Sequence, residues 1–213
     1  MKKSYILFSV IILFYCFGCN SNTSEKDEII EEELTKEEVL KKRYADTVIP
    51  LFETFNNVEI PTEFIIDSKD NSLNAGASFG YVEVSQGLIN YKKEYIQVYV
   101  LAHEVAHIVT LNQASLFGLQ GAIPSGGVTN DYKKAEFLAD LIAIHLINTQ
   151  LPEQMKLIYS DFDNLKNLLG LGSFTHPSGL KRIDLMNQYL IGAETTTSSD
   201  SFETIFKQIW DMD

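Results

Sequence analysis

The fold is decided by residues 95–111, which read YIQVYVLAHEVAHIVTL. This stretch is predominantly apolar and lacks glycine and proline, which predicts a helix in the protein interior. Within it lies the motif His103-Glu104-Val105-Ala106-His107. At 3.6 residues per turn the two histidines lie about 40° apart on one face, so both imidazoles can bind one Zn²⁺. Glu104 lies about 100° from His103, within reach of a water molecule on that metal.

A third zinc ligand is expected from a second helix. Glu136-Phe-Leu-Ala-Asp140 places two carboxylates on one helical face. Glu136 would complete the zinc shell, and Asp140 would accept a hydrogen bond from the free imidazole N–H of a ligand histidine. An acidic protein also carries such pairs on solvated faces. The preceding H-E-x-x-H motif and the apolar opposite face favour the metal site, with one Zn²⁺ per chain.

The amino terminus predicts export. Lys2 and Lys3 precede an apolar stretch, residues 5–17, that is too short to span a bilayer as a helix. We therefore interpret residues 1–18 as a signal peptide. The sequence around Cys19 is similar to the cleavage site of bacterial lipoproteins, which predicts lipidation of Cys19. An ordinary secreted protein with a chance cysteine is the alternative.

A lipidated Cys19 would place the protein in the bacterial cell envelope, periplasmic or surface-exposed, with a membrane as its partner. Residues 19–34 are polar and acidic, which predicts a solvated tether. Both cysteines of the chain lie before residue 20, so disulfides would not stabilise the folded domain. About 170 residues remain beyond the tether, enough for one domain with its own core.

The charge balance excludes one class of partner. The chain has 17 Lys+Arg against 29 Asp+Glu, a formal net charge of −12. Such an acidic surface is a poor match for the phosphates of nucleic acid.

Ahead of the motif, the sequence predicts a helix and a small sheet. Thr35 begins a capping-box pattern, and apolar residues recur at helical intervals from 39 to 55. Two extended segments follow, residues 63–67 and 80–85, separated by a turn-rich stretch. We expect them to pair as an antiparallel sheet.

After residue 93 the pattern is helical almost to the end, with breaks at 118–130, at Pro152 and at 170–177. The apolar residues of 195–213 are expected to dock as a final helix, with a partner-binding role as the alternative. The predicted fold class is α+β: a mostly helical domain with a small antiparallel sheet next to the H-E-x-x-H helix.

The order of the motifs resembles a known family. H-E-x-x-H followed by Glu-x-x-Ala-Asp is similar to the gluzincin metallopeptidases of the HtpX, Oma-type and CAAX prenyl protease family. Further similar segments are Asn74-Ala75, Gly87-Leu88-Ile89, Thr175-His176-Pro177-Ser178 and Arg182-Ile183. The resemblance implies a zincin-like fold and a zinc metallopeptidase domain over residues 35–213, in a form that lacks the transmembrane helices of several relatives.

The resemblance also implies a substrate-binding strand. In this family the segment that begins Asn-Ala forms an edge strand beside the metal, against which an extended substrate lies. Asn74, Ala75, Gly76 and Ala77 would play that part through their backbone groups. A plain turn entering a strand is the alternative.

Two later residues resemble the family's remaining site positions. His176 and Arg182 would each donate to the oxyanion that develops when water attacks a carbonyl. Arg182 has an equally favoured alternative as an ion-pair partner of Asp140 or Glu136. His176 has the alternative of a residue with no catalytic role. His145 lies about 180° from Glu136 around its helix, so we interpret it as a structural histidine.

The function that follows is zinc-dependent hydrolysis of peptide bonds in polypeptides of the cell envelope, with Glu104 as the general base. A catalytically weak or inactive lipoprotein that acts as a binding or chaperone-like scaffold is the alternative. Residues 118–130, which join the two ligand-bearing helices, are either a lid over the cleft or a connector.

Overall fold

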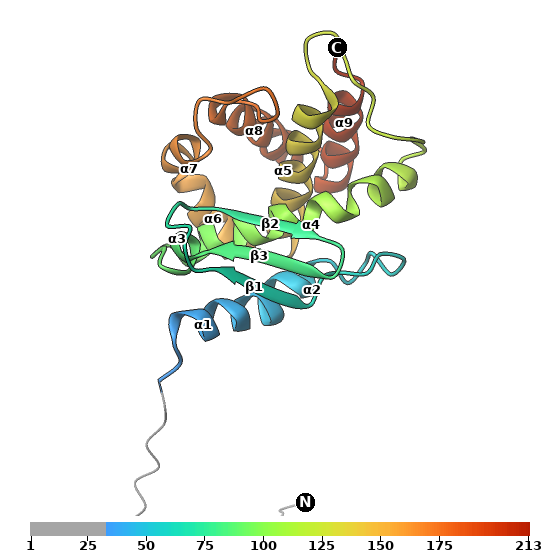
Figure 1. The fold of residues 1–213 in the computed structure, drawn as a ribbon. Coiled ribbons are helices and arrows are strands. Elements are labelled where there is room, and N and C mark those ends of the chain that lie inside the picture. Colours follow the sequence, from blue (N-terminus) through green and yellow to red (C-terminus); the bar gives the residue numbers. More distant parts are fainter. Residues whose placement is uncertain (1–32) are drawn as a thin grey trace, which may run out of the picture. The chain divides into compact units, whose positions relative to one another are not determined.

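The structure is a computed structural model and describes residues 33–213. The predicted signal peptide (1–18), Cys19 and most of the tether (19–34) lie outside the described residues. The described chain is mostly helical with one small sheet (Figure 1), which confirms the α+β fold class. None of the helices within 33–213 combines the length and the apolar character that a bilayer crossing requires.

The first helical segment begins where the sequence predicts. It consists of α1 (Lys36–Arg43), a π-helical stretch η1 (Tyr44–Val48) and α2 (Ile49–Leu51). Thr35 forms the capping box: its hydroxyl accepts from the Glu38 N–H, and the Glu38 carboxylate accepts from the Thr35 N–H at 2.8 Å. The helix ends before residue 55, and turns complete the predicted stretch. The residues that it buries are Leu40, Tyr44, Val48 and Leu51, while Val39 is exposed.

The sheet is mixed, so the antiparallel prediction is wrong for its first pair of strands. Strand β1 (Glu63–Asp67) runs parallel to β3 (Tyr81–Ser85), and β2 (Ala75–Ser78) runs antiparallel to β3 at the other edge. The cause is that the chain reverses twice between β1 and β3. It turns once through residues 68–74 into β2 and again in the tight turn between β2 and β3, where Gly80 adopts a φ of 94°, so β3 runs in the same direction as β1.

The helical layer is built around α4 (Glu94–Leu116) and α5 (Asp131–Gln150), which share the most extensive contact in the described chain. Helix α5 is buried over most of its length. The other helices are α3 (Gln86–Ile89), α6 (Pro152–Ser160), α7 (Phe162–Leu168), α8 (Gly179–Thr195) and α9 (Ser198–Trp210). As predicted, the carboxy-terminal stretch docks as a helix: α9 packs on α5 and α8.

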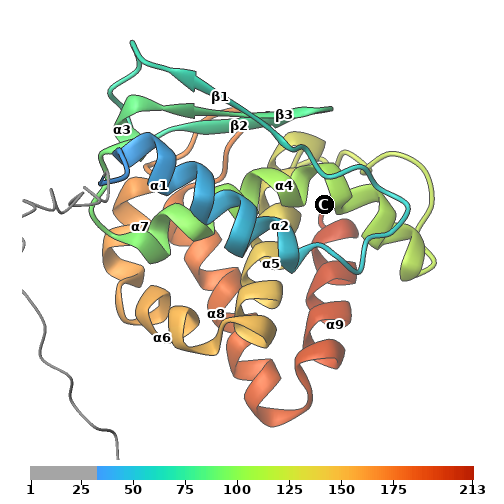
Figure 2. The same ribbon diagram turned by 90° about the horizontal axis from the view of Figure 1, so that it is seen from below.

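Figures 1 and 2 show how these layers are arranged. The sheet lies on one side of α4, with α1 and α2 alongside it, and α5 to α9 lie on the other side. The edge strand β2 packs against α4. Its free edge therefore borders the space between the sheet and the helices α5, α7 and α8.

Candidate metal centre and its cleft

The two histidines of the motif face the same side of α4. Their Nε2 atoms lie 3.1 Å apart, and their rings meet edge to face with centroids 4.7 Å apart. His103 is buried and His107 is partly exposed. Two ring nitrogens that both present lone pairs repel each other at this distance, unless a proton or a cation lies between them.

Glu136 of α5 completes the cluster. One of its carboxylate oxygens lies 3.4 Å from His103 Nε2, and the other lies 3.4 Å from His107 Nε2. Buried carboxylates ordinarily become neutral, but the neighbouring imidazoles and Arg182 overcome the effect of burial and hold the pKa of Glu136 well below its usual range. The side chains of His103, His107 and Glu136 can therefore hold a metal ion.

Asp140 orients His103, as its position one turn after Glu136 predicts. The Asp140 carboxylate accepts a hydrogen bond from His103 Nδ1 at 2.9 Å. With its proton held on Nδ1, a neutral His103 would direct the Nε2 lone pair toward His107 and Glu136. Burial acts to raise the pKa of Asp140, but Arg182 and His103 lower it to about 2, so the carboxylate is ionised.

Tyr99 also binds Asp140, a contact that the sequence analysis missed. The Tyr99 hydroxyl donates to Asp140 Oδ1 at 2.5 Å, and both side chains are buried. Tyr99 precedes His103 by four residues on α4, so the two side chains share a helical face. That i, i+4 spacing is the signal that was available from the sequence.

Arg182 of α8 joins the two carboxylates of α5. Its Nε and Nη2 each donate to Asp140 at 2.6 Å, and its Nη1 lies 3.2 Å from Glu136. Only 6% of the Arg182 side chain is exposed. The structure therefore contains the ion pairs that were one of the two predicted roles of Arg182. A contact between Arg182 and a substrate stays a prediction, and its side chain does line the cleft.

Glu104 projects into the same cleft without a fixed partner. Its carboxylate makes no hydrogen bond or ion pair with any residue of the described range, and it lines the cleft beside both histidines. Burial raises the pKa of Glu104, against the opposing effect of His103 and His107. A carboxylate with a raised pKa beside the residues of a candidate metal site is a candidate for proton transfer.

His176 stands at the rim of the cleft, on the loop that precedes α8. Its Nε2 lies 3.6 Å from Glu136, and its Nδ1 lies 2.8 Å from the Thr175 hydroxyl. The side chain is 56% exposed. His176 therefore lies beside the candidate metal ligands, as its sequence motif predicted, and its Nε2 faces Glu136.

The predicted substrate-binding segment contributes only its first part to the cleft. Asn74 and Ala75 line the cleft, and Gly76 and Ala77 continue as β2. The Asn74 side-chain amide donates to Asp70 at 3.3 Å, within the turn that leads into the strand. Among the described strands β2 pairs only with β3, so the backbone groups on its other edge have no strand partner.

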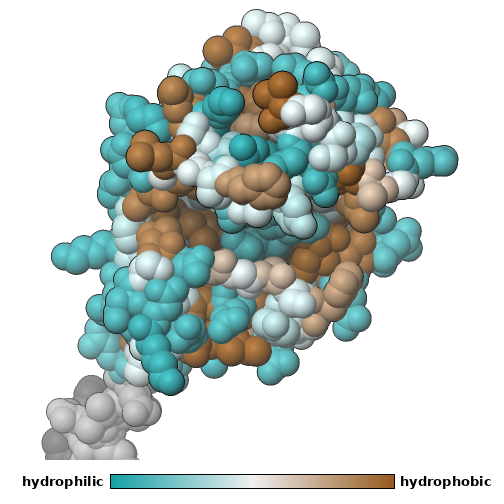
Figure 3. Space-filling view, turned by 45° about the horizontal axis from the view of Figure 1, so that its top comes forward, coloured by the Kyte–Doolittle hydropathy of each residue, from teal (hydrophilic) through white to brown (hydrophobic). Residues whose placement is uncertain are grey.

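The cleft, of about 290 Å³, has one apolar end that the sequence analysis did not predict. Leu165, Leu168 and Leu169, around the end of α7, form it together with Leu73 and Val100. Figure 3 shows that this face of the molecule is hollowed, with hydrophobic residues beside hydrophilic ones around the hollow.

Residues 118–130 lie outside the lining of this cleft. Backbone N–H groups of Gly127 and Thr129 instead donate to Asp213 at 2.8 and 2.9 Å. In this structure the segment is thus held by the carboxy terminus rather than folded over His103, His107 and Glu136, and a lid role stays a prediction.

His145 is structural, as its position on α5 predicts. Its ring stacks on Phe202 with centroids 4.0 Å apart and planes 2° apart, and its Nδ1 lies 3.0 Å from the Tyr189 hydroxyl. Burial lowers the pKa of His145 to about 4, so the imidazole is neutral at physiological pH.

No protein-family model matches the chain, and neither the curated proteins nor the solved structures include a match. The function is therefore inferred from the residues of the cleft.

Proposed function

We propose that this protein is a zinc-dependent endopeptidase that hydrolyses peptide bonds of polypeptides. The observation that carries the proposal is the triangle of ligand atoms, with separations of 3.1 Å between the histidine nitrogens and 3.4 Å from each nitrogen to Glu136. Zinc bonds of 2.0–2.1 Å in tetrahedral geometry hold ligand atoms about 3.4 Å apart. Two imidazoles and one carboxylate are also a donor set of catalytic zinc sites.

Glu104 is the proposed general base. Zinc at this site would supply Lewis acidity that activates water and polarises a peptide carbonyl. Glu104 takes a proton from the attacking water and then gives it to the leaving amine nitrogen as the C–N bond breaks. The absence of a fixed partner for this carboxylate within the described residues keeps it free for both transfers.

The proposed substrate lies extended along β2. The unpaired edge of β2 can hydrogen-bond to a peptide backbone independently of its side chains. His176 at the rim and Arg182 at the base can donate to the oxyanion that forms on the attacked carbonyl. The apolar end of the cleft would accept a hydrophobic side chain near the cleaved bond.

We also propose that the protein is a gluzincin metallopeptidase with a zincin-like fold, related to the HtpX, Oma-type and CAAX prenyl protease family. Support comes from the positions of the motifs that resemble this family, which are far apart in the sequence but close together in the structure. H-E-x-x-H, Glu136, His176 and Arg182 come from α4, α5, a loop and α8, and all line one cleft.

The first experiment measures zinc in the purified protein and in a Glu136→Ala variant after identical dialysis. We expect one zinc ion per chain in the wild type and loss of most of it in the variant. Glu153→Ala is the matched control, because Glu153 is exposed and pairs only with Lys156 on α6. A wild type that binds no zinc from added metal would refute the proposal.

Glu104→Gln separates the peptidase from a scaffold that binds without cutting. The variant should keep one zinc ion per chain and lose turnover of an unfolded protein substrate by about 10²-fold or more, because the amide cannot accept the proton. A zinc-loaded wild type that cuts none of a broad set of unfolded polypeptides would instead favour the scaffold.

We further propose that a lipid on Cys19 tethers the enzyme in the bacterial cell envelope, where envelope polypeptides are its substrates. This proposal rests on the amino-terminal sequence. Mass spectrometry of the protein from membranes should find a diacylglyceryl group on Cys19. In a Cys19→Ala variant, the protein should leave the membrane fraction. Recovery of unmodified wild-type protein from the soluble fraction would contradict the tether.

A further inference from the structure

A second cavity adjoins the metal cleft at His176. It is about 670 Å³ in volume, and its walls come from α5, α8, α9 and the loops 118–130 and 170–178. His176 lines both this cavity and the metal cleft. A polypeptide that passes over His176 therefore meets both spaces.

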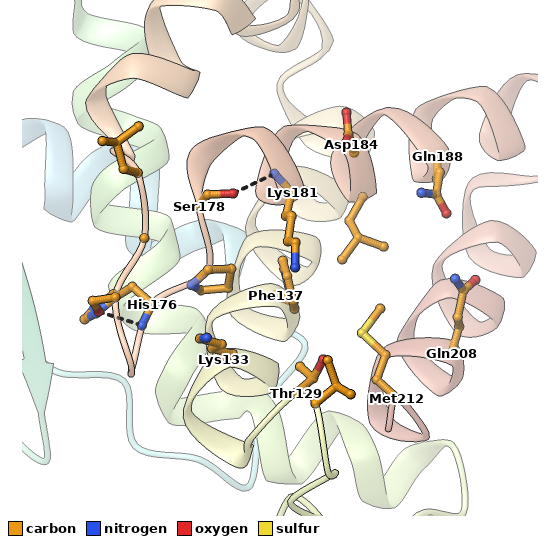
Figure 4. Close-up of a pocket in the computed structure, with 16 residues that line it drawn as sticks. Thr129, Lys133, Phe137, His176, Ser178, Lys181, Asp184, Gln188, Gln208 and Met212 are labelled. Carbon is orange, nitrogen blue, oxygen red and sulfur yellow. Dashed lines mark hydrogen bonds between the residues drawn. The ribbon is translucent and has the colours of Figure 1, made fainter.

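Two lysines bring positive charge to this cavity from different helices. Lys133 lies on α5 and Lys181 on α8, and both line the cavity (Figure 4). Within residues 33–213 neither ammonium group makes an ion pair or a hydrogen bond; only the backbone N–H groups of these residues bond to their helix caps. In a chain with a net charge of −12, two unpaired lysines in one cavity form a local site for anions.

The rest of the lining suits a carboxylate on an aliphatic stem. Gln188, Gln208 and Ser178 offer neutral donors, and Phe137 and Leu185 provide apolar surface. Asp184 also lines the cavity, but its carboxylate points away from Lys181 in Figure 4.

The lysines lie beside residues of the metal centre along the chain. Lys133 precedes Glu136 by three residues on α5, which is less than one helical turn, and Lys181 directly precedes Arg182. One turn spans about 5.4 Å, and an extended peptide advances about 3.3 Å per residue. Because His176 lines both spaces, a side chain in the cavity would belong to a residue a few positions from the cleaved bond.

We propose that this cavity binds an acidic side chain of the polypeptide substrate, so that the enzyme prefers chains with Asp or Glu a few residues from the cleaved bond. The inference rests on the proposed peptidase function for its substrate. The binding of an acidic peptide can nevertheless be measured without hydrolysis.

The test uses zinc-loaded Glu104→Gln protein and two fluorescent peptides of equal length, one with glutamates and one with glutamines at the same positions. Anisotropy should show binding of the glutamate peptide about fivefold or more tighter at low salt, with the preference falling as salt rises. Equal affinities for the two peptides would overturn the proposal.

The lysines are tested by the double variant Lys133→Met/Lys181→Met in the same background. The preference for the glutamate peptide should disappear while zinc content stays at one per chain. The control is Lys41→Met/Lys69→Met, which removes the same charge from exposed positions outside the cavity and should keep the preference. A preference that survives in the first variant, or is lost equally in both, would place the effect outside this cavity.

Three further arms separate the possible sources of the anion and the two proposals. Free glutarate or inorganic phosphate that displaces the peptide at micromolar concentration would assign the cavity to a small anion and overturn the substrate role. If the wild type cuts no polypeptide but binds the glutamate peptide more tightly, the peptidase function is rejected and the cavity remains a binding site for acidic side chains. The third arm is digestion of a mixed peptide library. If the library is cut but acidic residues are not enriched near the cleaved bonds, the substrate preference is rejected and the peptidase function is kept.

Discussion

The Tyr99 hydroxyl donates a 2.5 Å hydrogen bond to Asp140, the carboxylate that also holds His103. Tyr99 thereby acts on the metal cluster through Asp140 and His103. Hydrogen bonds to the partner of a ligand histidine help to fix the tautomer and the orientation of that histidine.

Tyr99→Phe should therefore weaken zinc binding about tenfold, because it removes one donor from Asp140 while keeping the ring in the core. Competition with a zinc chelator measures the dissociation constant. The control is Tyr95→Phe, one turn earlier, where the lost hydrogen bond is to Asp161. Unchanged zinc affinity in Tyr99→Phe, with its fold intact by circular dichroism, would show that the contact is structural only.

Removal of Arg182 should destabilise the metal-free protein strongly. Arg182→Met removes one of the two cations beside the buried carboxylates of Asp140 and Glu136 and leaves His103 as the other, so we expect a loss near the lower end of the about 3–5 kcal/mol that breaking a buried pair costs in the free energy of unfolding. Urea denaturation measures the change. Lys156→Met, which breaks an exposed pair with Glu153, should change the free energy by less than about 1 kcal/mol. The double variant Arg182→Met/Asp140→Leu should recover part of the loss, and an Arg182→Met protein as stable as the wild type would contradict this account.

Zinc binding should release a proton from His103. Burial acts to lower the pKa of His103, but Asp140 and Glu136 raise it to about 9 in the metal-free protein. The imidazole is therefore protonated at neutral pH and must become neutral to bind metal. At pH 7.5 we expect zinc binding to release this proton. Above about pH 9 the imidazole is already neutral, so no proton should be released on binding, and the zinc affinity should increase between these two pH values. Calorimetry in buffers of different ionisation enthalpy measures the release, which should not stay constant across that range.

His145 should make the free energy of unfolding fall as the pH becomes acidic. Its pKa is about 4 in the folded protein against an ordinary value of 6.5, so its contribution is complete above pH 6.5 and is lost as the pH falls toward 4. His145→Gln removes the titration. Between pH 6.5 and 4 the free energy of unfolding should fall by up to about 2 kcal/mol more in the wild type than in this variant. This value is smaller than the full pKa shift implies, because the ring keeps some contact with water. Parallel denaturation curves for the two proteins at each pH would reject the prediction.

The parts of the site that follow from helical spacing could be predicted from the sequence. His103 and His107 share a face of α4, and Glu136 and Asp140 share a face of α5, because residues four apart always do so in a helix. No comparable spacing rule predicts which residues of two different helices come into contact. The ion pairs of Arg182 with both carboxylates, and the presence of Lys133 and Lys181 in one cavity, depend on how α8 packs against α5. The spacing of residues along the chain does not specify that packing.

The sheet shows the same limit. The residues of β1 and β3 were identified as extended, but their relative direction depends on β2, which lies between them in the chain. Ala75–Ser78 contains small residues with little strand preference, so only the family resemblance implied a strand there, and its antiparallel pairing with β3 is seen only in the folded protein.

The three residues that could hold a metal ion lie on the consecutive helices α4 and α5, and this sets the order in which the parts of the site are synthesised. A chain made from its amino terminus contains the complete ligand set once α5 has emerged. Arg182, the buried cation that neutralises the carboxylates of α5, arrives later with α8. Until then the carboxylates of Glu136 and Asp140 have the histidines of α4 but not Arg182 as partners, so a metal ion captured early would add the missing positive charge and favour the docking of α4 on α5 before the last helices close over them.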